Sequence, residues 1–281
     1  MLEHLEKSPK AYYNHSFLGS PSARTLRLLS EYLEPLDRLN KSGIKDTIVF
    51  FGSARIKSTK DAKKELNDLL KTGKKINKSE RKTKEKFESE LENAEANLKM
   101  SRYYEETERL AYLLTKWSMS LSKGNKFVVC SGGGPGIMEA ANKGAKKAGG
   151  LSIGFNISLP FEQYPNPYIT PELNFEFHYF FMRKFWFAYL AKAVVIMPGG
   201  FGTLDEFMEV LTLVQTIKLR KKMDLIIYGE EFWNEIVNFK ALAKYNMISK
   251  EDLSLFKFAN TPEEAFSYLK KGIKKNYIKL L

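Results

Sequence analysis

Apolar residues recur along the chain with two spacings, one typical of helices and one typical of buried strands. Over 24–39 they fall three and four positions apart, as they do along one face of an amphipathic helix. Short continuous runs of β-branched and aromatic residues, such as 47–51 and 193–197, predict strands that are buried on both faces. Segments of the two kinds alternate through most of the chain.

The alternation predicts a definite order of elements. The expected strands are 47–51, 127–130, 151–157, 175–179, 193–197 and 224–228. The expected helices are 24–39, 57–100 with a break near Gly73, 103–121, 137–147, 181–191, 204–217, 232–245 and 262–274. Strands that alternate with helices of about twelve residues imply parallel βαβ units. We therefore predict an α/β fold, a Rossmann-like doubly wound parallel sheet flanked by helices, with a helical lysine-rich insertion.

The same pattern predicts how the chain is divided. We expect an N-terminal helical leader over 1–45 and one Rossmann-like domain over 46–281, which carries the helical insertion at about 57–100. The sequence contains no internal repeat. One domain with an insertion is the simplest interpretation of the order of elements.

Composition narrows the class of protein. Hydrophobic residues make up 43% of the chain, enough for a substantial core. No stretch reaches the roughly 20 apolar residues of a membrane span, and the charged first ten residues lack the apolar run of a signal peptide. The one cysteine, Cys130, excludes an intramolecular disulfide and a cysteine-based zinc cluster. We expect a cytoplasmic protein with no membrane partner.

The net charge of +12 raises the question of nucleic-acid binding. Between Lys57 and Glu88 there are twelve Lys or Arg residues against six Asp or Glu residues. Phe87 is the only aromatic residue in that segment, so bases have little to stack on. A solvated helical insertion is the favoured interpretation, with a surface for nucleic acid or an acidic partner as the alternative. Substrate phosphates also favour a basic protein.

Two glycine clusters each link a predicted strand to a predicted helix. The first, 131–136, reads Ser-Gly-Gly-Gly-Pro-Gly and matches neither the dinucleotide pattern G-x-G-x-x-G nor a P-loop. The second, 198–206, reads Pro-Gly-Gly-Phe-Gly-Thr-Leu-Asp-Glu. Glycines let the backbone approach a ligand, the helix N-terminus offers N–H groups to an anion, and parallel strands end at one edge of the sheet. Both clusters are therefore expected to line one crevice. The alternatives are a simple tight turn at the first cluster and a T-x-x-E capping box at the second.

Several of these segments resemble one known family. Residues 198–206 resemble the signature P-G-G-x-G-T-x-x-E of the Lonely Guy family, whose members are often mislabelled as lysine decarboxylases. Residues 131–142 look like the first glycine turn of that family, and 51–55 (Phe-Gly-Ser-Ala-Arg) look like the end of its first strand. Residues 177–184 (Phe-His-Tyr-Phe-Phe-Met-Arg-Lys) are similar to the Arg-Lys segment of its longer members. The resemblance runs from about 24 to 245, with the insertion as an interruption.

The resemblance implies a nucleotide-binding catalytic domain that hydrolyses a purine nucleoside 5′-monophosphate, such as AMP or a cytokinin riboside monophosphate, to a free base and ribose 5-phosphate. It implies Arg183 and Glu206 as the catalytic pair and needs no metal or cofactor. The substrate contacts that it implies are Gly52, Ser53, Gly132, Gly133, Gly134, Glu162, Lys184, Gly199, Gly200, Phe201, Gly202, Thr203 and Thr212. It also implies a homodimer or a higher homo-oligomer with the active site near the subunit interface.

Alternatives accompany these expectations. A non-catalytic nucleotide or molybdenum-cofactor binding protein of the same fold is the second candidate, whereas nothing resembles a pyridoxal-phosphate lysine site. His178 is expected in the core or at an interface. The aromatic residues of 180–187 are expected in the core or in a dimer contact, with base stacking by one of them as the less favoured interpretation.

Overall fold

The computed structural model describes residues 7–73, 81–122, 126–159 and 164–278. Seven strands form one all-parallel sheet with the order β4-β3-β2-β1-β5-β6-β7. The strands are β1 (Asp46–Phe51), β2 (Phe127–Ser131), β3 (Ser152–Ile157), β4 (Asn174–Phe177), β5 (Ala191–Ile196), β6 (Asp224–Tyr228) and β7 (Lys257–Ala259). The predicted α/β doubly wound sheet is confirmed. The short strand β7 was not predicted.

The order of the strands reverses beside β1. From β1 the chain builds β2, β3 and β4 outward on one side, then returns to add β5, β6 and β7 on the other side. The register pairs Phe51 at the end of β1 with Ile196 at the end of β5. Open parallel sheets bind ligands where the strand order reverses, because the two adjacent chain segments leave in opposite directions and a crevice opens between them. This position is therefore the place to look for a site.

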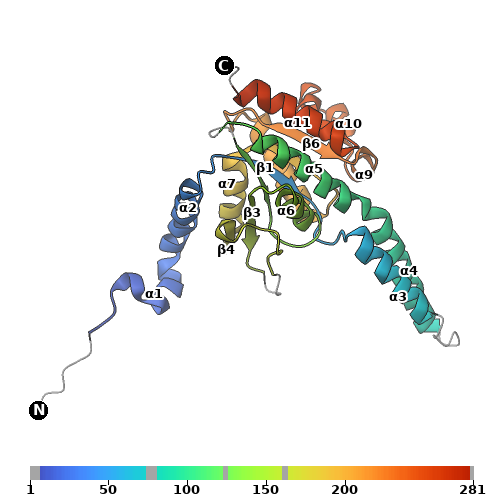
Figure 1. Cartoon of the computed structure of the whole chain (residues 1–281), viewed down its shortest axis with the longest axis horizontal. Coiled ribbons are helices and arrows are strands. Elements are labelled where there is room, and N and C mark those ends of the chain that lie inside the picture. Colours follow the sequence, from blue (N-terminus) through green and yellow to red (C-terminus); the bar gives the residue numbers. More distant parts are fainter. Residues whose placement is uncertain (1–6, 74–80, 123–125, 160–163, 279–281) are drawn as a thin grey trace, which may run out of the picture.

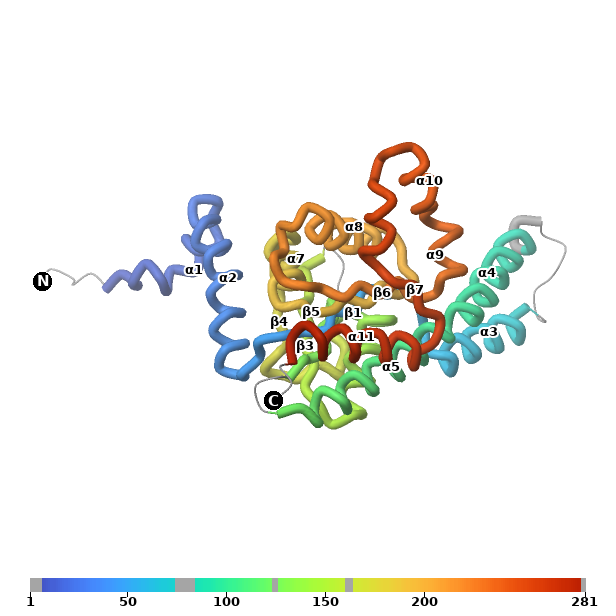
Figure 2. The backbone as a smooth tube through the Cα atoms, turned by 90° about the horizontal axis from the view of Figure 1, so that it is seen from above, coloured from blue at the N-terminus to red at the C-terminus, as the bar shows by residue number. Residues whose placement is uncertain are grey.

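Helices cover both faces of the sheet (Figures 1 and 2). They are α1 (His15–Gly19), α2 (Arg24–Lys41), α3 (Thr59–Gly73), α4 (Arg81–Met100), α5 (Arg102–Met119), α6 (Ile137–Lys147), α7 (Phe180–Leu190), α8 (Phe201–Gln215), α9 (Glu230–Ile236), α10 (Phe239–Lys244) and α11 (Pro262–Tyr277). Short 3-10 helices occupy Ala11–Tyr13, Pro21–Ala23, Pro171–Leu173 and Glu251–Ser254.

Successive residues of each central strand point to opposite faces of the sheet, so they enter two separate hydrophobic cores. Val49 and Phe51 of β1 pack with residues of α2, α7, α8, α9 and α10, whereas Ile48 and Phe50 pack with residues of α5, α6 and α11. Figure 2 shows α5 and α11 on one side of the strands and α7 and α8 on the other. Both faces of the sheet are covered, which explains the continuous apolar runs in its strands.

One predicted helix is two helices in the structure. The chain over 232–245 forms α9 and α10, which are separated at Val237 and Asn238. The reason is a helix cap: the Asn238 side chain accepts a hydrogen bond from the backbone N–H of Ala241 at 2.9 Å. An asparagine in this position starts a new helix instead of continuing the old one.

Two helical segments project from the body on opposite sides, α1 with α2 at one end and the α3–α4 hairpin at the other (Figures 1 and 2). The segments 57–73 and 84–100 together hold eight lysines against eight acidic residues. Ion pairs such as Lys57–Glu65, at 2.8 Å, join some of them. The basic excess of the insertion therefore falls on 74–83, whose side chains lie outside the described part, so the described hairpin has the charge balance of a solvated insertion.

Within the described residues, no helix is both long and apolar enough to cross a membrane.

Candidate active site

A cavity of about 670 Å³ lies where the sheet order reverses, beside the carboxyl ends of β1 and β5. Both glycine clusters reach it, the first through Gly132 and the second through the turn from Gly199 to Thr203. The lining residues are Gly52, Ser53, Ala54, Arg55, Gly132, Met138, Asn156, Ile157, Leu159, Phe180, Arg183, Gly199, Gly200, Phe201, Gly202, Thr203, Leu204, Glu206 and Ile236.

Arg183 is held in this wall by three neighbours. Its Nε donates a hydrogen bond to the backbone carbonyl of Phe155 at 2.7 Å, and its guanidinium lies 5.0 Å from the centroid of the Phe187 ring. Its Nη1 lies 3.2 Å from Oε1 of Glu206. The side chain is only 11% exposed, so the guanidinium is fixed in direction and largely shielded from water. A cation with three fixed partners is pre-organised for recognition of an anion.

Gly132 makes room for this guanidinium. A Cβ at position 132 would collide with Nη2 of Arg183 and would lie 2.7 Å from Sδ of Met138. The first glycine cluster therefore contributes space to the site as well as a turn. Gly136 has a different task, because its φ of +70° and its approach to the backbone of Ser53 and Ala54 both require glycine.

Glu206 is a buried carboxylate with an altered affinity for protons. Its side chain is 14% exposed, and burial raises the pKa of Glu206 to about 7. The positive charge of Arg183 opposes this increase, whereas the neighbouring Asp205 adds to it. A carboxyl group that titrates near neutral pH in a cavity is suited to accept and return a proton.

The capping-box alternative for Thr203 and Glu206 does not hold. Helix α8 begins at Phe201 with Gly200 as its N-cap, and no side chain caps it. Thr203 is therefore already the third residue of the helix, and Glu206 lies nearly one turn further in. The helix starts earlier than the predicted 204–217, so the two residues are out of phase with a capping box.

The N-terminus of α8 opens into the same cavity. Gly199, Gly200, Phe201, Gly202 and Thr203 all line it. The first N–H groups of a helix have no partner within the helix, and the helix dipole adds positive potential there. With no side chain capping α8, this end of the helix is suited to receive an anion.

Two predicted substrate contacts lie elsewhere. Lys184 and Thr212 line a separate surface depression, to which Asp205 and Glu209 contribute but Glu206 does not. Lys184 Nζ forms ion pairs with Asp205 at 2.7 Å and Glu209 at 3.0 Å. The Thr212 hydroxyl donates to the carbonyl of Met208 at 2.8 Å. Lys184 therefore faces the two acidic neighbours of Glu206 rather than the cavity.

Other predicted contacts also fall outside the cavity lining. Gly133 abuts the Asn156 amide, and the carbonyls of Gly133 and Gly134 accept hydrogen bonds from Asn166 Nδ2 at 2.9 and 3.1 Å. Both glycines thus shape the turn and do not line the cavity. Glu162 lies outside the described residues.

Sequence reasoning missed several residues that line the cavity, namely Ala54, Arg55, Met138, Asn156, Ile157, Leu159 and Ile236. Phe180, which also lines it, was expected in the core or in a dimer contact, with base stacking as the less favoured interpretation. The sequence motifs could have identified Arg55, because it is the last residue of the segment 51–55, which follows the first predicted strand. They could not have identified Ile236, because its place depends on how α9 returns over the sheet. No local pattern encodes that return.

The aromatic residues of 180–187 divide into two groups. Trp186 and Phe187 are buried, as expected of core residues, whereas Phe180, Phe181 and Phe185 are exposed. The side chain of His178 is exposed to solvent in the single chain, so it does not belong to the core. Its backbone N–H donates a hydrogen bond to the Glu31 carboxylate at 2.8 Å. Cys130 is fully buried, and burial raises the pKa of its thiol well above the usual range, as expected of an inert cysteine.

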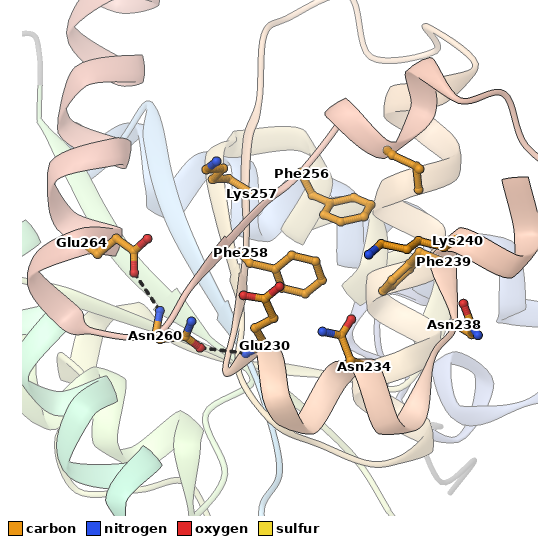
Figure 3. A pocket seen from close by; sticks show the side chains of 11 residues that line it. Glu230, Asn234, Asn238, Phe239, Lys240, Phe256, Lys257, Phe258, Asn260 and Glu264 are labelled. Atoms are coloured by element: carbon orange, nitrogen blue, oxygen red, sulfur yellow. Dashed lines mark hydrogen bonds between the residues drawn. The ribbon is translucent and has the colours of Figure 1, made fainter.

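A second cavity, of about 630 Å³, lies at the β7 end of the sheet between α9, α10 and α11 (Figure 3). Its polar groups hold the local backbone together: Asn260 Oδ1 accepts from the N–H of Glu230, and Glu264 accepts from the N–H of Asn260, both at 2.9 Å. Its acidic and basic side chains are exposed, in contrast to Arg183 and Glu206. The cavity at the reversal of the sheet is therefore the stronger candidate for chemistry.

The fold and this cavity define a Rossmann-like α/β protein with a buried acid–arginine pair at the reversal of its sheet. Residues 138–269 match the family model described as "Possible lysine decarboxylase". The match covers a little less than half of the chain, which is similar to that family over this part, and it supports the resemblance to the Lonely Guy family, whose members often carry that label.

Comparison with curated proteins gives no match. Among solved structures, the molybdenum cofactor carrier protein from Chlamydomonas reinhardtii is 15% identical, with 82% of this chain and 98% of that chain covered and a TM-score of 0.46. The molybdenum cofactor binding protein from Rippkaea orientalis is 20% identical, with 60% and 86% covered and a TM-score of 0.44. Similarity at this level does not establish what the present chain binds.

The raised pKa of Glu206 predicts that the free energy of unfolding depends on pH. Burial raises the pKa of Glu206 from 4.5 to about 7, so the folded state binds the carboxyl proton more tightly than the unfolded state does. This proton binding stabilises the folded state at low pH, and the stabilisation is lost as the pH rises through about 7. Replacement Glu206→Gln removes the charge and keeps the shape. We expect the variant to be more stable than the wild type by about 1–3 kcal/mol at pH 8, and by roughly 0.5 kcal/mol or less at pH 4.5. Urea denaturation at both pH values measures this difference.

The matched control is Glu235→Gln, which neutralises an exposed glutamate on α9. It is expected to leave the pH dependence of unfolding unchanged. A gain for Glu206→Gln that is equally large at both pH values would contradict a buried, destabilising carboxylate.

Proposed function

We propose that this protein is a cytoplasmic phosphoribohydrolase that cleaves the N-glycosidic bond of a purine nucleoside 5′-monophosphate, AMP or a cytokinin riboside monophosphate, to free base and ribose 5-phosphate. The observation that carries the proposal is the pairing of Glu206 with Arg183, 3.2 Å apart, in the wall of a cavity that also receives the N-terminus of α8. The family match over 138–269 supports it.

The 5′-phosphate binds at the N-terminus of α8. The backbone N–H groups of the turn from Gly199 to Thr203 and the dipole of a fifteen-residue helix favour a dianion there. Glycine on both sides of Phe201 keeps the backbone accessible. Phosphate held at this point places the ribose across the cavity, toward Glu206.

Glu206 acts on the anomeric carbon. Departure of the base leaves positive charge on the sugar, and a carboxylate beside it stabilises that charge, as carboxylates do in glycoside hydrolysis. A water oxygen bonds to C1′ as the C1′–N bond breaks, and the electron pair of that bond goes to the base nitrogen. Glu206 takes one proton from the water and returns it to the leaving base. Atoms and charges balance without any further reactant.

Arg183 fixes the carboxylate and contacts the substrate. Its charge lowers the pKa of Glu206 and so keeps part of the carboxylate ionised near neutral pH despite burial. Without that cation the acid would remain protonated and unable to accept a proton. The backbone carbonyl of Phe155 and the ring of Phe187 hold the guanidinium in position for this task.

A protein that only binds or carries a nucleotide is the alternative. Such a protein gains nothing from a buried carboxylate next to a phosphate site, because the two negative charges repel each other. The presence of Glu206 in the cavity therefore favours an enzyme. Incubation with AMP and detection of free adenine separates the two functions, and intact nucleotide after binding of AMP, GMP and IMP would indicate a binding protein.

Removal of either member of the pair tests the roles directly. Glu206→Ala is expected to lower kcat by at least about 100-fold with little change in the affinity for AMP, because general acid–base catalysis and charge stabilisation are lost. Arg183→Ala is expected to weaken both binding and turnover. Adenine release measures kcat and KM, and calorimetry measures AMP affinity.

The control for these variants is Asp205→Asn, which removes the adjacent carboxylate on the same helix. Asp205 is 57% exposed and faces Lys184. It should retain turnover at pH 8 within a few-fold. Normal kinetics of Glu206→Ala would remove Glu206 from the mechanism.

Turnover should follow the ionisation of Glu206. Since the base form is the active one and the pKa of Glu206 is about 7, kcat/KM is expected to rise with pH on a single limb centred near that value and then reach a plateau. Asp205 raises this pKa, so Asp205→Asn should move the limb to lower pH. A profile that is flat between pH 5 and 8 would contradict the assignment.

We also propose that the chain forms a homodimer or a larger homo-oligomer, with no nucleic acid or membrane as partner. Helices α2 and α7 carry adjacent exposed apolar groups, among them Leu29 (51% exposed) and Leu33 (50%) on α2 and Tyr189 (47%) on α7. The rings of Tyr32 and Phe185, 5.7 Å apart, connect the two helices. Exposed apolar surface of this kind is typical of subunit contacts.

Light scattering tests the assembly. The wild type should have at least twice the chain mass of 32.3 kDa, whereas the double variant Leu29→Glu/Leu33→Glu should have the mass of one chain. Leu70→Glu, which changes an exposed leucine on the α3–α4 hairpin, is the control and should leave the mass unchanged. A wild-type monomer would contradict the proposed oligomer.

A further inference from the structure

Three large apolar side chains that line the cavity are exposed to solvent. Phe180 is 53% exposed, Phe201 is 93% exposed and Ile236 is 50% exposed, and all three line the cavity that holds Arg183 and Glu206. They come from the first turn of α7, the first turn of α8 and the end of α9. Separate elements thus bring apolar groups to one place without burying them.

Position, and not exposure alone, distinguishes these rings. Phe181 is next to Phe180 on α7 and is 54% exposed, yet it lines the separate depression beside Lys184. Trp186 and Phe187, one to two turns further along, are buried in the core. Phe180 therefore lies on the one side of α7 that faces the cavity and is still accessible to a ligand.

The lining of the cavity combines charged groups with apolar ones. Arg55, Arg183, Glu206 and the N-terminus of α8 supply the charged and polar groups, whereas Met138, Ile157 and Leu159 join the three exposed side chains as apolar ones. A nucleotide also has both kinds of surface, with a charged sugar phosphate and a flat base whose faces are apolar. The cavity therefore offers partners for both.

Asn156, the amide that lines the cavity, is already engaged in hydrogen bonds. Its Nδ2 donates to Asn174 Oδ1 at 2.7 Å and to the carbonyl of Phe175 at 2.9 Å. Its other amide atom lies against Gly133. Both hydrogens of this amide therefore serve the structure of the β3–β4 region, which leaves Asn156 no side-chain N–H to donate to a base.

We propose that Phe180 and Phe201, with Ile236 beside them, form a stacking surface for the base, which selects purines over pyrimidines by ring area. This inference rests on the proposed function, because it names the base-recognition part of the same site. Stacking on an aromatic ring accepts any base, and its strength grows with the area of contact. Adenine, hypoxanthine and guanine nucleotides should therefore bind with similar affinity, and cytosine nucleotides more weakly.

The experiment separates recognition of the base from turnover. Calorimetry in a Glu206→Gln background, which prevents hydrolysis, gives the affinities for AMP, CMP and ribose 5-phosphate. Phe180→Ala and Phe201→Ala are each expected to weaken AMP about 10-fold, which corresponds to about 1.4 kcal/mol, and CMP less. Ribose 5-phosphate, which has no base, should bind as before within about 2-fold.

Phe181→Ala is the matched control, since it removes an equally exposed ring from the neighbouring position. It should leave all three affinities unchanged. Phe201→Leu keeps an apolar side chain but removes the ring, and its loss of AMP affinity should lie between those of the wild type and Phe201→Ala. Circular dichroism of each variant checks that the fold is retained.

Distinct outcomes overturn the inference and the proposed function. Unchanged AMP affinity in both alanine variants, or an equal loss for AMP and ribose 5-phosphate, overturns the stacking surface. If the wild type releases no base but AMP affinity still depends on the two rings, the proposed hydrolysis fails and the stacking surface stands. If base is released and the rings have no effect, the hydrolysis stands and the stacking surface fails.

Discussion

The contact between the Glu206 carboxylate and the Arg183 guanidinium determines what the surrounding structure must provide. Each group alone would be expensive to remove from water, and a buried pair stabilises a fold only when its remaining hydrogen-bonding groups are satisfied. Here the guanidinium has further partners in the Phe155 carbonyl and the Phe187 ring, while burial still raises the pKa of Glu206 to about 7. The pair is thus held in place at a free-energy cost that the rest of the fold offsets.

Three backbone elements hold the acid and the arginine together: strand β3, the turn after β2 and helix α8. Strand β3 supplies the Phe155 carbonyl, and Gly132 at the end of β2 leaves the space that the guanidinium occupies. Helix α8 begins at Phe201, which brings Glu206 to the cavity and leaves its first N–H groups open. These elements meet because β1 and β5 are neighbours at the reversal of the sheet. A change in strand order would separate the acid from the arginine even if every residue were kept.

The sequence was sufficient for the parts of this arrangement that depend on local pattern. The apolar runs predicted strands β1 to β6, and the two glycine clusters predicted turns at the carboxyl edge. Residue spacing did not show the phase of α8, in which Thr203 is the third residue instead of the cap, because T-x-x-E fits both arrangements. Nor did it show that Lys184 turns away to Asp205 and Glu209, since adjacent residues on a helix point about 100° apart.

The direction of Lys184 explains how charge is distributed around the site. The carboxylates of Asp205 and Glu209 raise the pKa of Glu206, and Lys184 lowers it. By binding both carboxylates outside the cavity, Lys184 offsets their effect without adding its own charge to the cavity. Positive charge in the cavity lining then comes from Arg55, Arg183 and the first amide groups of α8, where we propose that a phosphate binds. Phe180, Phe201 and Ile236 line the same cavity, so a ligand with an anionic part and an apolar part would find both kinds of partner there.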